Sequence, residues 1–591
     1  MTHSSLFAYL LSHARHAGER TAVLSKSHGA YRAITWSQLL AGVDRVSAAL
    51  VALGIQPGDR VCLFAGTTLS WLTADLGIIG AGAVPVPLYP SASAEDCSRI
   101  IAHADARVVL VDSAAQARRL LPARDRLVDV RCIVQLQRDD SEEHNVAQVA
   151  AWDGWVMACA DAEALGESIS ASTLQQRRDG LTSAALASLL YTSGTTGAAK
   201  GVMMTHGALI YGAQAWAQMQ LFRQDDVQFL FLPLAHSLAR QLVSAWLVTP
   251  HTLAFAESID SLRRNLREVK PTVMVGVPRL YERMYHALVQ RAAAHGRGVV
   301  SVVHGIVASA AWDGPAGGAR GEVLRSTLGE DLRIALGGRM RALFSGGAPL
   351  PGAVERLFQH AGSEILQLYG LTESGAVGAV SRPGSNRLGT AGLPPPGTQM
   401  RIAGDGEVLM RGPGLMRGYW RDPQGTAAAI VEGWLHTGDI GAFDAAGHLR
   451  IADRKSHLIT TRDGHTVAPQ TCENLLKGHP LISQALVCVD GSHDLAVLLT
   501  LDRERLYNLV GRDAAVRDSE AILVQRPDVR GAVAEILRAV NAQAGPGYTL
   551  QRFVILAQDF SVATGEITPC LKLRRRIIAS RYRHLIDACA N

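Results

Sequence analysis

The segment from Tyr191 to Gly201 contains the residues of this chain that are best suited to bind an anion. Its sequence, YTSGTTGAAKG, places hydroxyls, glycines and one lysine between the apolar run Ala185–Leu190 and the apolar triplet 202–204. Glycines let backbone N–H groups turn toward an anion, and hydroxyls and a lysine add donors for phosphate oxygens. A flexible linker has a similar composition, but it has no reason to lie between two strand-like runs. The candidate phosphate ligands are Thr192, Ser193, Gly194, Thr195, Thr196 and Lys200.

This loop differs from the Walker loop. In a Walker loop the lysine follows the second glycine directly and a serine or threonine comes next, whereas here two alanines separate Gly197 from Lys200, and Gly201 follows. The segment therefore predicts a nucleoside triphosphate that is held in another way.

A second candidate site follows the apolar run that begins at Ile365. At its end Tyr369 could stack on a base, Thr372 could donate to a phosphate, and Glu373 could ligate Mg²⁺ through oxygen. Because ligands bind at the carboxyl edge of open α/β sheets, this position favours a site over a simple helix cap. Gly346, Gly347 and Ala348 follow an earlier strand-like run, where glycines permit close approach to a flat ring or form an ordinary turn.

Two further polar positions lie toward the C-terminus. Asp439, in GWLHTGDI, follows a Thr-Gly turn and suits two vicinal ribose hydroxyls, although turn aspartates commonly serve the local backbone. Lys572, in GEITPCLKLR, precedes a basic run that on its own indicates a solvated patch.

In their order along the chain these segments resemble the signature regions of the acyl-adenylate-forming (AMP-binding) superfamily, which includes acyl-CoA synthetases, peptide-synthetase adenylation domains and firefly luciferase. The resemblance implies an adenine-binding edge, a ribose-binding aspartate, an arginine that ends the next hairpin and a catalytic lysine. That lysine would bridge the carboxylate and the α-phosphate as charge develops. The residues so matched are Gly346, Gly347, Ala348, Tyr369, Gly370, Thr372, Glu373, Asp439, Arg454 and Lys572.

Two other runs resemble long-chain fatty acyl-CoA synthetases within that superfamily. They are FLPLAHSLAR, which ends at Arg240, and VPRLYE, which begins at Val277. By this resemblance His236 lines the acyl pocket and Arg240 lies where related enzymes gate the fatty-acid tunnel. Without the flanking match, His236 would be interpreted as a satisfied core histidine.

The resemblance implies two half-reactions that use ATP, Mg²⁺ and coenzyme A as second substrate. A fatty-acid carboxylate first forms an acyl-adenylate, the C-terminal part then rotates, and the thiol of coenzyme A displaces AMP. The chain departs from the usual Gly-Arg-Lys-Lys-Asp hinge with Asp453-Arg-Lys-Ser-His457, and Asp463-Gly464 replaces a Gly-Gly pair. These changes leave the acyl acceptor open: coenzyme A, or the pantetheine of an acyl carrier protein. The alternatives from other classes are a non-catalytic binder of acyl-adenylate or ATP and a luciferase-like oxygenase.

The elements around these segments predict an α/β fold. Strand-like and helical runs alternate over 35–130 and again over 229–348, which indicates parallel-rich sheets flanked by helices, and short strands with turns over 390–454 indicate a β-rich subdomain. We expect a large N-terminal domain over 1–453 that binds AMP and the acyl group, and a small mobile α+β domain over 454–591 that carries the lysine. The stretch 140–178 has little pattern and is interpreted as an insertion or surface loop.

Composition narrows the function classes. With 591 residues, 48% hydrophobic residues and a formal net charge of +5, the chain is expected to be globular, multidomain and not a nucleic-acid binder. Its eight cysteines show no CxxC pair and are interpreted as buried thiols in a reducing compartment. We expect a cytoplasmic location with possible peripheral contact with the inner face of the membrane, and an amphipathic first helix. Chain-length preference, pathway and oligomeric state do not follow from these patterns.

Overall fold

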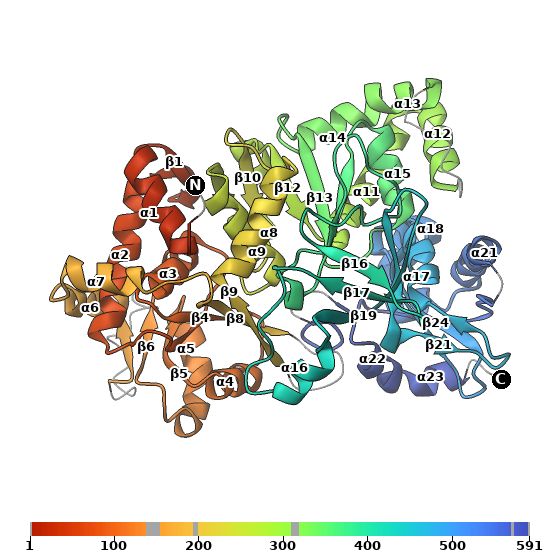
Figure 1. The fold of residues 1–591 in the computed structure, drawn as a ribbon. Coiled ribbons are helices and arrows are strands. Elements are labelled where there is room, and N and C mark those ends of the chain that lie inside the picture. The colour runs from red at the N-terminus through yellow and green to blue at the C-terminus, as the bar shows by residue number, and fades with distance from the viewer. Residues whose placement is uncertain are drawn as a thin grey trace.

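Two parallel-rich sheets form the framework of the part of the chain up to Val380 (Figure 1). The computed structural model describes residues 3–136, 154–192, 199–308, 318–545, 547–568 and 572–588. The larger sheet has the order β15-β14-β13-β12-β10-β11-β1-β2, and its strands are parallel except β15 and β2 at the two edges. Its strands are β1 (Thr21–Ser27), β2 (Ala30–Thr35), β10 (Val227–Leu230), β11 (Thr252–Phe255), β12 (Val273–Gly276), β13 (Ala342–Gly346), β14 (Ile365–Tyr369) and β15 (Ala379–Val380).

The second sheet is entirely parallel and is buried on both faces. Val61 and Leu63 point into one hydrophobic core, while Cys62 and Phe64 between them point into another, so the strand is an uninterrupted apolar run. Its order is β4 (Val84–Leu88), β3 (Arg60–Phe64), β5 (Ala106–Val111), β6 (Cys132–Gln135) and β7 (Val156–Ala158). A separate hairpin of β8 (Leu186–Thr192) and β9 (Lys200–Thr205) pairs Thr192 with Lys200.

Helices form a layer that shares its core with both sheets. Residues of α1 (Leu6–Ala17), α2 (Trp36–Ala52), α3 (Leu69–Gly80), α8 (His206–Gln218) and α9 (Ser237–Val248) belong to one cluster with the strands of both sheets. The helix α2 begins with a capping box, in which the Thr35 hydroxyl accepts from the Gln38 N–H and the Gln38 side chain accepts from the Thr35 N–H. The second core of the five-stranded sheet is covered by α4 (Ala94–His103) and α5 (Ala114–Leu120).

Further helices line the larger sheet beyond β12 and β13 (Figure 1). They are α10 (Leu262–Val269), α11 (Pro278–Ala292), α12 (Arg297–Ala308), α13 (Ala319–Leu324), α14 (Glu330–Ala335) and α15 (Gly352–His360). An antiparallel unit follows, made of β16 (Gln399–Ile402), β17 (Glu407–Arg411), α16 (Pro423–Ala429), β18 (Ile430–Val431), β19 (Trp434–Phe443) and β20 (Leu449–Arg454). This unit confirms the predicted β-rich subdomain.

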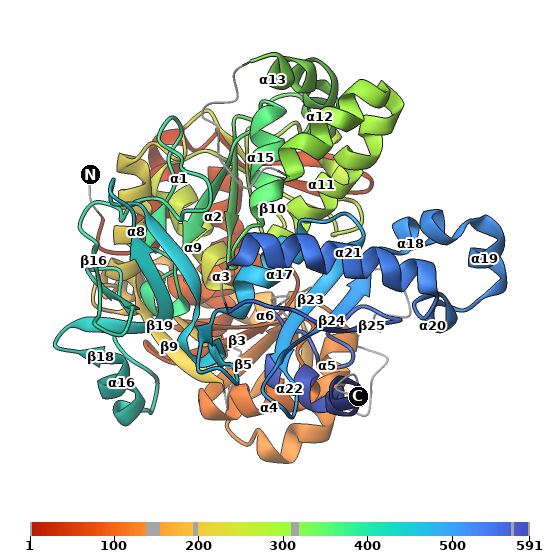
Figure 2. The same ribbon diagram turned by 90° about the vertical axis from the view of Figure 1, so that its right-hand side faces the viewer.

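The chain beyond Arg454 has hydrophobic clusters of its own. A sheet of β23 (Ile482–Val489), β24 (Leu495–Leu501) and β25 (Arg552–Leu556) lies at its centre, and β21 (Ile459–Thr460) pairs with β22 (Thr466–Val467). Its helices are α17 (Pro469–Lys477), α18 (Arg503–Val510), α19 (Arg512–Arg517), α20 (Glu520–Leu523), α21 (Pro527–Ala544), α22 (Arg575–Arg581) and α23 (Arg583–Ala588). Figure 2 shows α21 running across this part and α18–α20 projecting away from the rest. The separate cores fit the expected α+β unit after residue 453.

The prediction of a surface loop over 140–178 is wrong for the residues that the structure describes. Residues 156–158 form β7 of the parallel sheet, and α6 (Cys159–Gly166) and α7 (Ala171–Asp179) follow it. The helix α6 packs closely on α2 through small residues. A Cβ added to Gly166 would lie only 2.7 Å from the Ala49 nitrogen, so this contact requires glycine. Such close packing of small side chains leaves no apolar stripe for sequence patterns to detect.

Two other expectations agree with the structure. The predicted first helix is α1, capped by the Ser5 hydroxyl and buried through four of its first five residues. The cysteines within the described residues are buried free thiols. In the part of the chain described above, no helix is long and apolar enough to cross a membrane.

Candidate active site

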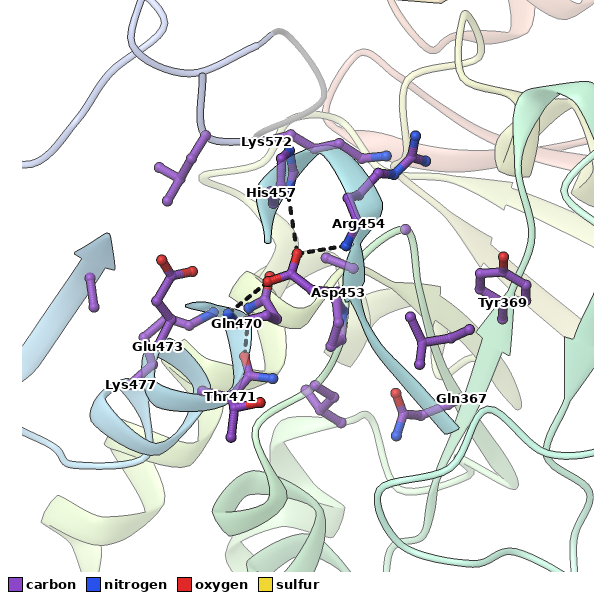
Figure 3. A pocket seen from close by; sticks show the side chains of 18 of the residues that line it. Gln367, Tyr369, Asp453, Arg454, His457, Gln470, Thr471, Glu473, Lys477 and Lys572 are labelled. Atoms are coloured by element: carbon purple, nitrogen blue, oxygen red, sulfur yellow. Dashed lines mark hydrogen bonds and ion pairs between the residues drawn. The ribbon is translucent and has the colours of Figure 1, made fainter. Parts of the chain in front are cut away.

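A cavity of about 2100 Å³ gathers most of the predicted site residues. It lies at the carboxyl ends of β13 and β14, where Gly347, Ala348 and the segment 369–373 line it, as expected for an open α/β sheet. The N-terminus of α9, the strands β19 and β20, the helix α17 and Lys572 also contribute to its walls, so segments far apart in the sequence meet here (Figure 3).

Glycines bring backbone to the edge of this cavity. Gly347 has φ +87°, a left-handed conformation that favours glycine, directly after β13. At Gly370 an added Cβ would lie 2.4 Å from the Ala376 carbonyl carbon, so only glycine lets the chain turn back so tightly after β14. Gly346 is the last residue of β13 and is not among the residues that line the cavity.

Asp439 is held by two donors at the cavity wall. The Tyr369 hydroxyl donates to its Oδ2 at 2.7 Å, and Arg454 Nε lies 2.8 Å from its Oδ1. The pairing of β19 with β20 sets Asp439 directly opposite Arg454. Asp439 is only 5% exposed, and burial raises its pKa even though Arg454 opposes the shift. Burial, reinforced by the Asp439 carboxylate, also raises the pKa of Tyr369, so the phenol stays a donor.

Glu373 and Lys200 both contact Tyr419, an aromatic residue that the sequence analysis did not identify as part of the site. The Tyr419 hydroxyl donates to Glu373 Oε1 at 2.8 Å, while Lys200 Nζ lies 4.6 Å from the centre of the same ring and 3.6 Å from Asp422 Oδ2. Burial and the Glu373 carboxylate raise the pKa of Tyr419. The only local signal is an aromatic pair in a turn-rich segment, which is typical of many surface turns.

Thr372 lies beside the N-terminus of α9. Its hydroxyl donates to Ser237 Oγ at 3.3 Å, and both residues line the cavity. Thr192 and Lys200, at the two ends of the hairpin β8–β9, line it as well. The predicted phosphate ligands Ser193, Gly194, Thr195 and Thr196 lie outside the described residues.

His236 caps α9 and faces the cavity. Its Nδ1 accepts from the Leu238 N–H at 3.1 Å. Burial, together with the Lys572 ammonium, lowers the pKa of His236 to about 3, so the ring is neutral. Because Nδ1 accepts, the ring proton is assigned to Nε2, which leaves an N–H donor for a ligand.

Arg240 occupies a different environment one turn further along α9. Its guanidinium forms a buried ion pair with Asp75 of α3 and lies 5.5 Å from the centre of the Trp71 ring. Arg240 is not among the residues that line the cavity. The pair neutralises two buried charges between α9 and α3, and the predicted role of Arg240 as a gate stays a prediction.

Lys572 reaches the cavity from the last part of the chain. Its N–H donates to Thr568 Oγ1 at 3.0 Å, and its carbonyl accepts from the Thr568 N–H at 2.8 Å. Its ammonium is close enough to act electrostatically on both His236 and Asp439. Figure 3 shows the lysine above Arg454 and His457.

Asp453, which begins the segment that departs from the expected hinge sequence, has a well-defined structural environment. Its Oδ1 accepts from the Arg454 N–H at 2.7 Å and lies 3.2 Å from His457 Nδ1, and its Oδ2 accepts from the Gln470 N–H at 2.9 Å (Figure 3). Burial alone would raise the pKa of Asp453, but these donors and the nearby Arg575 guanidinium outweigh burial and lower it. Asp453 thus joins β20 to the first turn of α17.

The basic run 574–576 is not a continuous exposed face. Arg575 forms an ion pair with Glu473 of α17, and Glu473 is buried. The alternative interpretation of this run as a solvated patch therefore does not hold for Arg575, because a buried carboxylate neutralises it.

Among the described residues, no group of three or more His, Cys, Asp or Glu side chains could hold a metal ion by itself. A single cavity-lining carboxylate such as Glu373 is nevertheless compatible with the way Mg²⁺ binds beside substrate phosphates, through one or two carboxylates and water.

Comparisons with known proteins agree with this architecture. The model of the AMP-binding enzyme family matches residues 10–420. The long-chain-fatty-acid–CoA ligase FadD15 of Mycobacterium bovis is 33% identical over 600 residues, which cover 100% of this chain and 97% of the relative. The human long-chain-fatty-acid–CoA ligase ACSBG2 is 28% identical and covers 96% of this chain and 90% of its own length. A carboxylate reductase adenylation domain from Mycobacterium chelonae superposes with a TM-score of 0.77 at 21% identity, over 99% of this chain and 91% of that domain.

Proposed function

The chain belongs to the AMP-binding enzyme family, and on this premise we propose that it is a fatty acid–CoA ligase. In this proposal a medium- to long-chain fatty acid is activated by ATP to an acyl-adenylate, and coenzyme A then takes the acyl group. The observation that carries the proposal is the convergence of Asp439, Glu373, His236 and Lys572 on one cavity. The names of the full-length relatives favour long-chain acids.

In the first half-reaction a carboxylate oxygen of the fatty acid attacks the α-phosphorus of ATP, and the bond to pyrophosphate breaks. Asp439 accepts hydrogen bonds from the ribose hydroxyls. Tyr369 and the backbone near Gly347 lie on either side of the adenine, and Lys200 and Thr372 contact the phosphates. Lys572 lies between the carboxylate and the α-phosphate, where its charge stabilises the developing negative charge. Glu373 would hold Mg²⁺, which when bound neutralises charge on the triphosphate.

In the second half-reaction the sulfur of coenzyme A attacks the acyl carbonyl carbon, and AMP leaves. The thiol proton is released as the thioester forms. The neutral His236 can donate from Nε2 to an oxygen at the reacting centre. No protein nucleophile is needed, because positioning and charge neutralisation account for both steps.

We extend the proposal to two domains, residues 1–453 and 454–591, that move relative to each other between the half-reactions. The separate cores beyond Arg454 support such a division. Asp453, at the boundary, contacts Gln470 and His457, whereas a glycine at this position would have no side chain to make these contacts. Because these contacts restrict movement at the boundary on which the coenzyme A step depends, an acyl carrier protein is kept as a second candidate acceptor.

The test is to incubate purified protein with Mg·ATP and fatty acids of increasing length, with and without coenzyme A. Pyrophosphate and acyl-CoA are measured separately. Release of both with coenzyme A supports the ligase and gives the preferred chain length. One equivalent of pyrophosphate without thioester would instead point to a carrier protein, and no fatty-acid-dependent pyrophosphate would refute the proposal.

A further inference from the structure

Helix α11 carries three polar side chains that contact the chain beyond Arg454. Arg279 Nη1 donates to the Ser483 carbonyl at 2.5 Å, the Tyr285 hydroxyl donates to the Gly478 carbonyl at 2.8 Å, and Lys477 Nζ lies 3.5 Å from Glu282 Oε1. The three helix positions are spaced by three residues and therefore share one side of α11. The sequence motif VPRLYE thus contributes two of the residues that hold the two parts of the chain together.

Arg279 makes the most extensive of these contacts. Its Nη2 donates to Ser483 Oγ at 3.0 Å and to Asp559 Oδ2 at 3.2 Å, in addition to the bond from Nη1 to the Ser483 carbonyl. The planar guanidinium can reach a carbonyl, a hydroxyl and a carboxylate at once, which a lysine ammonium on a flexible stem cannot match. The contact is therefore specific to arginine.

Asp559 connects this grip to the segment that carries Lys572. Ser483 Oγ donates to Asp559 at 2.9 Å, and the next residue, Phe560, donates its N–H to Gln484 Oε1 at 2.7 Å. Phe560 is buried in the same cluster against which Leu573, the neighbour of Lys572, packs. The cluster that buries Phe560, next to Asp559, is thus also contacted by the neighbour of Lys572.

We propose that Arg279 is a positioning residue for acyl-adenylate formation, because its grip on Ser483 and Asp559 holds the Lys572 segment against the cavity. This inference rests on the function proposed above, in which Lys572 serves the first half-reaction alone. Arg279 touches neither substrate in that scheme. Its loss should therefore affect the rate of adenylation more than the affinity for ATP, and should spare the second half-reaction.

The experiment compares Arg279→Gln with Arg283→Gln. Arg283 is an exposed arginine on the same helix, without a recorded ion pair or side-chain hydrogen bond to another described residue, so it is a matched control. Pyrophosphate release is measured with fatty acid and ATP, and thioester formation is measured from supplied acyl-adenylate. We expect Arg279→Gln to lower kcat for pyrophosphate release about 10- to 100-fold, as for loss of hydrogen bonds to a charged group. Thioester formation and the KM for ATP should be retained, and Arg279→Lys should recover part of the rate.

A second readout needs no activity. Backbone hydrogen exchange over 557–568 and 572–588 should speed up in Arg279→Gln and in Asp559→Asn but not in Arg283→Gln. Combining the first two substitutions should add little to either one, because both remove the same contact. Equal loss of both half-reactions, or unchanged exchange, would overturn the role of Arg279. Wild-type protein that releases no pyrophosphate would refute the ligase instead, and the exchange data would still decide whether Arg279 holds the segment.

Discussion

Replacing Asp439 by asparagine tests the nucleotide site directly. The carboxylate is buried and accepts from the Tyr369 hydroxyl at 2.7 Å, with Arg454 Nε at 2.8 Å. Asparagine keeps the shape and one acceptor oxygen but removes the negative charge. It therefore weakens any pair of bonds from the ribose hydroxyls without opening a hole in the wall of the cavity.

The size of the effect follows from the kind of bond that is weakened. A hydrogen bond to a charged group contributes about 1.5–3 kcal/mol, roughly twice a neutral one, so two ribose bonds that become neutral lose about 1.5–3 kcal/mol together. This corresponds to an ATP affinity lower by about 10- to 150-fold. Arg454 is 44% exposed, so water can solvate it once its partner is neutral, and we expect little change in folding stability.

The assay is equilibrium binding of ATP and of a fatty acid, measured separately. Asp444→Asn is the matched control, because Asp444 lies in the turn between β19 and β20, accepts from the Ala446 and His448 N–H groups, and is not among the cavity-lining residues. The control should bind both ligands like the wild type. Unchanged ATP affinity in Asp439→Asn, or an equal loss of fatty-acid affinity, would refute the assignment to the ribose.

Three further outcomes can be measured. Lys572→Ala should lower pyrophosphate release by about 100-fold or more while thioester formation from supplied acyl-adenylate persists, and equal loss of both would contradict its role. Asp453→Ala removes an acceptor of three bonds and should lower the free energy of unfolding by about 2–4 kcal/mol in urea titrations; a loss below that range would mean that the hinge contacts contribute little. Burial lowers the pKa of His206 to about 3 and of His251 to about 4. Because the unfolded chain takes up those protons first, stability should fall as pH drops below about 6.5, by up to about 2 kcal/mol per histidine at pH 5, and His206→Gln should flatten that slope in thermal melts.

Where a pattern is local, the sequence predicted the structure closely. The strands β3, β4 and β12 coincide with short apolar runs of the sequence, because each is buried on both faces of a parallel sheet. The apolar run 229–232, in contrast, extends two residues beyond the end of β10, because only residues 227–230 pair with β11. Sequence patterns therefore predict that a strand or helix exists more reliably than they predict where it begins and ends.

The sequence did not predict which charged residues would pair with partners far away along the chain. Nothing near Arg240 indicates that Asp75 would neutralise it, and nothing near Arg575 indicates Glu473. The same holds for Tyr419, because its contacts are with Glu373 and Lys200, which lie in two other segments of the chain. The residue types in the motifs predicted the chemistry of the site, whereas the structure was needed to show which charged residues pair with one another.

Two sets of side-chain contacts help to orient the C-terminal part. Asp453 connects β20 to α17, and at a separate point α11 contacts this part through Arg279, Glu282 and Tyr285. With both sets of contacts made, Lys572 lines the cavity. In the proposed scheme, a rotation that removes Lys572 from the cavity would break the Arg279 contacts. The arrangement described here therefore suits the proposed adenylation step, and the free energy of those contacts would have to be given up before the second step.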